Sequence, residues 1–250
     1  MLTIRRQQQQ AFQRAALRRF EDEMVEHIKK FAQKHCEVIG EPAVRSVIRL
    51  GMARAKQYGF TNRGPVRFYL ELMFMFGSFF DGDPQLPWVM QILNDRAMQD
   101  QMVRAERLHG MTMEYLIYVV GPNKEYYMEA LRRISQARVE DFPVTDGDIE
   151  NAAVRALNTL YPQKCEYVEQ ARLRALIQGC LKEAKDHGVS TWKGVLLFIL
   201  LAFTLGHGCA SDPQFPWIGA TLDNAPVGDP DARTERLYKK ATAYLAGALG

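Results

Sequence analysis

The chain has 250 residues and a mass of 28.6 kDa, which is enough for one large domain or for two domains of ordinary size. Apolar residues make up 47% and charged residues 24%, a composition that excludes a disordered chain. The 32 Lys and Arg against 29 Asp and Glu leave a net charge of +3, which argues against a nucleic-acid partner. The opening MLTIRRQQQQAF lacks the apolar segment of a secretory signal, and four cysteines in this length predict reduced thiols in a cytoplasmic protein: Cys36, Cys165, Cys180 and Cys209.

The first segments of the chain predict amphipathic helices. Apolar residues three or four positions apart predict one helix from about Thr3 to Lys34 and another from Glu41 to Tyr58. Gly59 supplies the residue that ends the second of these helices. A nearly apolar central helix is expected at about 64–80, and a last helix of this part at about 98–119.

The sequence DPQLPW at 83–88 lies between the central and last helices. Asp83 precedes Pro84, so it is expected to turn the chain and to accept hydrogen bonds from free N–H groups. Pro87 suits the first position of a short helix, and Trp88 is expected to anchor that helix to the core. We interpret the motif as architectural; the alternative is a ligand pocket against the tryptophan.

Residues 121–146 form a connecting segment. It begins with the Gly121-Pro122 break, predicts a helix from about Asn123 to Arg138, and ends in a turn-rich stretch. Thr145 is expected to cap the helix that follows.

Residues 147–245 repeat residues 18–116 at a constant separation of 129 residues, without a gap. DPQLPW falls on DPQFPW at 212–217, RAERL at 104–108 falls on RTERL at 233–237, and Cys36 falls on Cys165. These matches predict an all-α fold formed by tandem duplication of a unit of roughly five helices. The expected domains are 1–120 and 147–250, joined by 121–146 and related by approximate two-fold symmetry. The repeated motif then includes Asp212, Pro213, Pro216 and Trp217.

The uncharged stretch 194–210 resembles a membrane span, but it is short and contains Gly206 and His207. Its counterpart at 64–80 carries Arg67 and Glu71, which would be unfavourable in lipid. Both stretches are therefore predicted to be surrounded helices of a domain outside the membrane.

No pattern in the sequence predicts catalysis. The histidines form no HxxxH or HExxH motif, no CxxC pair occurs, and no GxSxG or phosphate-binding loop is present. Cys209 with His187 or His207 could be arranged as a nucleophile and base, and Asp81 with Asp83 as a pair of carboxylates, but no local signature supports either. We therefore expect no catalytic residue, no cofactor and no metal.

Basic residues mark candidate interfaces. The first helix carries Arg5 and Arg6, but acidic residues follow soon after, so a solvated or protein-docking face is favoured over a nucleic-acid arm. Arg104 and Arg233 occupy matching positions of the RxERL sequences. They are expected either to form surface ion pairs with nearby glutamates or to lie at an interface between the two copies.

The opening MLTIRRQQ, the following RRFEDEMVEHI, a YG pair and the MFMFG…DPxLPW run resemble a family of small helical accessory proteins. These proteins are encoded beside spike and effector genes of bacterial type VI secretion systems, and single-copy members correspond to about the first half of this chain. The second copy lacks the N-terminal motif. The resemblance implies work in effector delivery or self-protection, and it transfers no catalytic or binding residue.

The sequence therefore favours a non-enzymatic, cytoplasmic effector adaptor or chaperone whose partner is a secreted effector or a spike component. The alternative is an immunity protein that neutralises a toxin; the slightly basic charge favours the adaptor, because inhibitors of basic nucleases are commonly acidic. An enzyme with an unrecognised site and a structural subunit of the secretion particle are further alternatives. No nucleic acid or membrane partner is expected.

Overall fold

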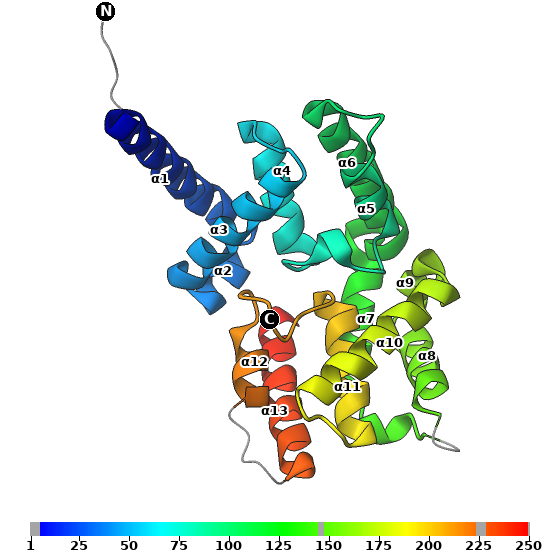
Figure 1. The fold of residues 1–250 in the computed structure, drawn as a ribbon. Helices are drawn as coiled ribbons and strands as arrows, with labels where there is room; N and C mark the ends of the chain where they lie inside the picture. Colours follow the sequence, from blue (N-terminus) through cyan, green and yellow to red (C-terminus); the bar gives the residue numbers. More distant parts are fainter. Residues whose placement is uncertain (1–5, 145–147, 224–228, 250) are drawn as a thin grey trace, which may run out of the picture.

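The computed structural model describes residues 6–144, 148–223 and 229–249, and every regular element within these ranges is helical (Figure 1). The chain is therefore all-α, as the sequence predicts.

We call residues 6–120 the first half and residues 148–249 the second half. The first half contains α1 (Arg6–Phe31), α2 (Gln33–Ile39), α3 (Glu41–Gln57), α4 (Arg63–Phe76), η1 (Phe80–Gly82), α5 (Pro87–Leu93), α6 (Gln101–Tyr115) and the π-helical turn η2 (Leu116–Val120). The connecting segment contains η3 (Pro122–Lys124), α7 (Glu125–Gln136) and η4 (Val139–Asp141). The second half contains α8 (Ile149–Leu160), α9 (Pro162–Val168), α10 (Gln170–Asp186), α11 (Trp192–Leu205), α12 (Pro216–Asp223) and α13 (Pro230–Leu249).

Helix boundaries repeat between the two halves. α3 (Glu41–Gln57) and α10 (Gln170–Asp186) have equal lengths and are separated by 129 residues, as are α4 (Arg63–Phe76) and α11 (Trp192–Leu205). α5 and α12 both begin at the second proline of their DPQxPW sequences. The halves differ at their starts, because α1 has 26 residues and α8 has 12.

Several predicted boundaries need correction. The expected helix 3–34 is interrupted at Ala32, whose φ of −131° and ψ of 53° leave the helical region, and α2 follows as a separate helix. The central helices end earlier than expected, at Phe76 and Leu205, because Gly77 and Gly206 adopt φ values of +97° and +100°.

The start of α8 is capped by a residue that the sequence pattern did not indicate. The predicted cap, Thr145, lies outside the described residues. The Asp148 carboxylate accepts a hydrogen bond of 3.0 Å from the backbone N–H of Asn151. This bond satisfies one of the free donors at the start of the helix.

One hydrophobic core runs through both halves. α11 lies at its centre, and all residues from Gly194 to Phe203 are buried. The strong apolarity of this helix is therefore explained by complete enclosure in protein. Across the described ranges, no helix combines the length and the apolarity that crossing a bilayer requires.

The connecting segment accounts for a sequence difference between the central helices. Val139 and Phe142 pack with Leu197 and Leu200 of α11 around a small apolar pocket. Leu200 stands where the first half has Glu71, which forms a hydrogen bond of 2.6 Å with the ring of His27. The connecting segment occurs once in the chain and packs on this face of α11. This explains why α11 has a leucine at the position where α4 has a glutamate.

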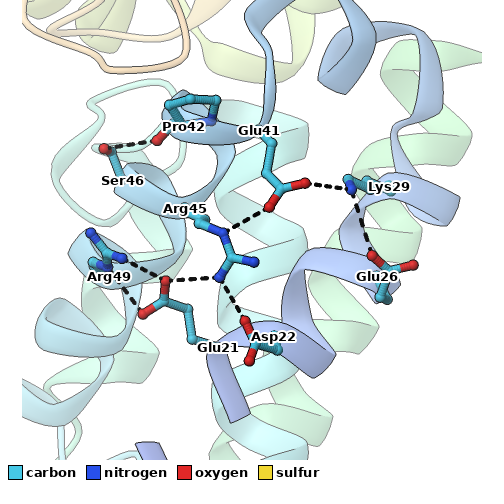
Figure 2. Close-up of polar contacts among 9 residues, drawn as sticks. All are labelled: Glu21, Asp22, Glu26, Lys29, Glu41, Pro42, Arg45, Ser46 and Arg49. Atoms are coloured by element: carbon cyan, nitrogen blue, oxygen red, sulfur yellow. Dashed lines mark hydrogen bonds and ion pairs between the residues drawn. The ribbon is translucent and has the colours of Figure 1, made fainter. Parts of the chain in front are cut away.

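Ion pairs attach α1 to α3 (Figure 2). Arg45 bonds to Asp22 at 2.7 Å and to Glu21 at 3.2 Å, and Arg49 binds Glu21 with bonds of 2.8 and 3.0 Å. The Arg49 guanidinium also holds the pKa of Glu21 below its ordinary value. These contacts lie near the middle of α1 and hold that part of the helix against α3. The N-terminal part of α1 extends beyond them, away from one side of the molecule (Figure 1).

Candidate functional site

At the junction of the halves, each DPQ turn forms hydrogen bonds with the turn that follows the central helix of the other half. Asp83 accepts bonds from the backbone N–H of Gln85 in its own turn, at 2.8 Å, and from that of His207 in the other half, at 2.9 Å. Asp212 accepts in the same way from Gln214, at 2.8 Å, and from the N–H and hydroxyl of Ser78, at 2.7 and 2.6 Å. Each buried carboxylate therefore stabilises its own turn and the facing turn together.

The glutamines of the two motifs make a second exchange. The Gln85 amide donates to the carbonyl of Ala202 at 3.3 Å, and the Gln214 amide donates to the carbonyl of Met73 at 2.8 Å. Both carbonyls lie in the last turn of a central helix, and each also accepts a bond from the backbone N–H of the glycine that follows the helix, Gly77 for Met73 and Gly206 for Ala202. The glutamine amides therefore act as second donors that join the ends of α11 and α4 to the other half.

Two glycines allow the turns to approach so closely. A Cβ atom on Gly77 would lie 2.7 Å from the carbonyl oxygen of Leu205, and one on Gly206 would lie 2.3 Å from that of Phe76. Both glycines also have positive φ values, which other residues adopt only with strain. No side chain can be accommodated at either position without moving backbone.

The prolines and tryptophans of the motif serve the turns and the short helices. Pro84 and Pro213 follow the two aspartates, and Pro87 and Pro216 open α5 and α12. Trp88 is buried, with its ring 6.3 Å from that of Phe76, whereas Trp217 is half-buried against Tyr244 at 5.7 Å. Only Trp88 therefore has the full burial that the sequence predicts for both.

The candidate interface arginines have different positions from those expected. Arg104 is buried and donates to the carbonyl of Leu93 at 3.0 Å, and Arg233 donates to that of His187 at 2.6 Å. These contacts join segments of the same half and replace the surface ion pairs predicted with nearby glutamates. Arg5 lies outside the described residues, and Arg6 is the first residue of α1, with its side chain also outside them.

The cysteines and the two aspartates weighed as catalytic groups are buried. All four cysteines are free and buried, and burial raises the pKa values of Cys165 and Cys180 to about 12 and that of Cys209 well above its ordinary value. Asp81 pairs with Arg54 and accepts a hydrogen bond of 2.7 Å from Tyr69. Among the described residues, no group of three or more His, Cys, Asp or Glu could hold a metal ion.

A cavity of about 410 Å³ lies beside the junction, between the first DPQ turn and the connecting segment. Asp83, Gln85 and Leu86 form one wall, and α7 forms another. Lys164 of α9 also lines the cavity although it is only 8% exposed. Its ammonium donates to the carbonyl of Phe203 and lies 4.5 Å from the centre of that ring.

Sequence reasoning missed Lys164 and the cavity. One signal was present: Lys164 precedes Cys165 as His35 precedes Cys36, so a basic residue occurs before the matched cysteine in both copies. Free cysteine is among the residue types most often buried, so a basic side chain beside it indicates a special environment. The depth of the cavity could not be read from this pattern, since the connecting segment forms one of its walls.

Comparisons of the chain with protein-family models, with curated proteins and with solved structures found no match.

Replacing Lys164 by methionine is expected to raise the free energy of unfolding at pH 7 by about 3 kcal/mol. Burial lowers the pKa of this lysine from 10.5 to about 8, and the difference corresponds to that energy. Below pH 8 the lysine is charged in both the folded and unfolded states, so the full free-energy cost of burying its charge remains. Between pH 8 and 10.5 the unfolded chain binds the proton more tightly, so the wild-type protein gains stability as pH rises.

Urea unfolding of both proteins from pH 7 to 10 measures the effect. The stability difference should shrink as pH rises, and taking the difference cancels the contribution of the buried tyrosines. A methionine variant that is less stable than wild type at pH 7 would contradict the prediction.

Proposed function

We propose that this chain is a non-enzymatic protein-binding accessory of a bacterial type VI secretion system that acts as an effector adaptor or chaperone. Its partner would be a secreted effector or a spike component, met in the cytoplasm. The secretion context comes from the resemblance of the first half to accessory proteins of these systems. The protein-binding role rests on one observation, the concentration of exposed apolar side chains in that same half.

The N-terminal part of α1 carries the clearest of these exposed surfaces. Every residue from position 8 to 19 is exposed, including Phe12 at 69% and Leu17 at 56%. Leu17 lies on the same helix face as Met24 and Ile28, which are buried, so this apolar stripe runs from the exposed part of α1 into the core. A stripe that is buried at one end and open at the other suits a second helix or groove laid against it.

Other exposed apolar side chains lie on α6 and η2. Their exposures of 45 to 64% exceed those of Trp192 and Tyr238, the large apolar residues exposed among the described parts of the second half. Methionine adapts readily to varied partner surfaces. The exposed residues on this element are Met102, Val103, Met113, Ile117 and Tyr118.

Charge indicates the chemistry of the partner segment. α1 has no acidic residue in its first turn, and Arg14, Arg18 and Arg19 lie in its exposed part. We infer that the partner presents an amphipathic helix whose apolar face is flanked by acidic residues. The same surface does not favour nucleic acid, since acidic residues follow from Glu21 onward and the overall charge is small.

We also infer that the chain is a tandem duplication with domains 1–120 and 147–250 and a connecting helix and turn at 121–146. Equal separations of helix boundaries and the reciprocal bonds of Asp83 and Asp212 support this inference. In such a chain, the second copy would provide the buried helix α11 to the core, and the first copy would provide the exposed apolar surface that binds the partner.

The test is co-purification of the full chain with the effector encoded by the neighbouring gene, followed by light scattering. A complex of fixed stoichiometry is expected, together with effector accumulation that depends on this chain. Phe12→Asp with Leu17→Asp should weaken binding at least roughly tenfold, because the charges replace the two most exposed large apolar side chains of α1. Tyr238→Asp is the matched control in the second half and should leave affinity unchanged.

Three outcomes would overturn the adaptor proposal. They are the absence of a complex, catalytic modification of the effector by trace amounts of the chain, and host killing by the effector whenever the chain is missing. The last would identify an immunity protein.

A further inference from the structure

The cavity beside the first DPQ turn has the size and lining of a small-molecule site. Its volume of about 410 Å³ lies within the range of roughly 300–1,000 Å³ that is usual for ligand pockets. Leu86, Leu131 and Ile134 provide apolar walls, and Tyr115 and Tyr127 provide aromatic ones. Charged and polar side chains share the lining with these apolar ones, among them Asp83, Gln85, Lys124 and Lys164.

Aromatic side chains occupy the corresponding place at the other side of the junction. There His35 occupies the position matching Lys164, with the ring of Phe215 at 5.6 Å and the hydroxyl of Tyr244 at 3.4 Å. Leu86 stands where the second half has Phe215, and the connecting segment supplies a wall that occurs once. The smaller Leu86 side chain thus lines the cavity at the position where the second half has the ring of Phe215 in contact with His35 and Tyr244.

The polar groups in the cavity lack complete partners. The Lys164 ammonium has three N–H donors, and its described hydrogen bond goes to the carbonyl of Phe203. The oxygens of Asp83 are engaged by Gln85 and His207. The side-chain oxygen of Gln85 is buried without a hydrogen-bond partner among the described residues. A donor and an acceptor at the cavity wall are thus available to a ligand.

We propose that this cavity binds a small organic acid, with the carboxylate on the Lys164 ammonium and an apolar ring or short acyl chain against Leu86, Leu131 and Ile134. The buried Lys164 ammonium suits a ligand carboxylate, and Lys124 adds a second, exposed positive charge to the lining. The Gln85 oxygen can accept a hydrogen bond from a hydroxyl or N–H group on the ligand.

The proposal is tested by calorimetric titration of the full chain with 3-phenylpropanoate and with octanoate, against the uncharged 3-phenylpropanamide and octan-1-ol. Saturable binding of at least one acid at one site per chain is expected, at least roughly tenfold tighter than its uncharged counterpart. Saturable binding of neither acid at low-millimolar concentration would overturn the proposal, as would equal affinity for acids and uncharged compounds.

Two variants locate the site. Lys164→Met should remove the preference for the acid, and Leu86→Phe should abolish binding by filling the cavity with a ring like that of Phe215 in the second half. Lys239→Met, at an exposed lysine paired with Glu235, is the control and should bind as wild type does. Because Lys164→Met removes a buried charge, it remains informative even if Leu86→Phe fails to fold. Unchanged acid binding by Lys164→Met would overturn the assignment.

Discussion

Replacing Gly206 by alanine is expected to lower the free energy of unfolding by about 4 kcal/mol or more. The new Cβ would lie 2.3 Å from the carbonyl oxygen of Phe76, an atom of the backbone that cannot move without displacing the end of α4. The φ value of +100° adds strain of roughly 1–2 kcal/mol for any residue other than glycine. Urea denaturation followed by circular dichroism measures the loss.

Helical glycines in open positions provide the control for this substitution. A Cβ atom on Gly110 in α6 or on Gly179 in α10 would meet no neighbouring atom of the described residues within 4 Å, so alanine there should stabilise the protein by roughly 0.5–1 kcal/mol. Gly77→Ala should resemble Gly206→Ala, since its Cβ would meet the carbonyl oxygen of Leu205. A loss below about 1 kcal/mol for Gly206→Ala would show that the two turns are not in the close contact described.

Replacing Trp88 by alanine is expected to lower the free energy of unfolding by roughly 3–5 kcal/mol. The indole is 5% exposed and packs edge-on against Phe76, so truncation removes a large buried surface and leaves a void under α5. Trp217→Ala should be milder, because Trp217 is half-buried. Chemical denaturation of both variants gives the comparison, and equal losses would contradict the difference in burial.

The sequence by itself determined the helical class and most helix positions. Apolar spacing located α3 to within one residue, and the proline before each tryptophan marked the starts of α5 and α12. These features depend on residues within a few positions of each other, so they can be read locally. The break at Ala32 was missed, since the apolar pattern continues across it into α2.

Tertiary structure alone decided the partners of the DPQ turns and the burial of Lys164. Asp83 and Asp212 were expected to serve their own turns, and they do, but they also bond to residues 124 and 134 positions away. Local periodicity cannot specify such partners, because any free N–H would satisfy the same carboxylate. Lys164 is enclosed by α11, the first DPQ turn and the connecting segment, which come together only when the two halves pack. A lysine on a short helix is ordinarily exposed, and only that packing turns it into a buried charge beside a cavity.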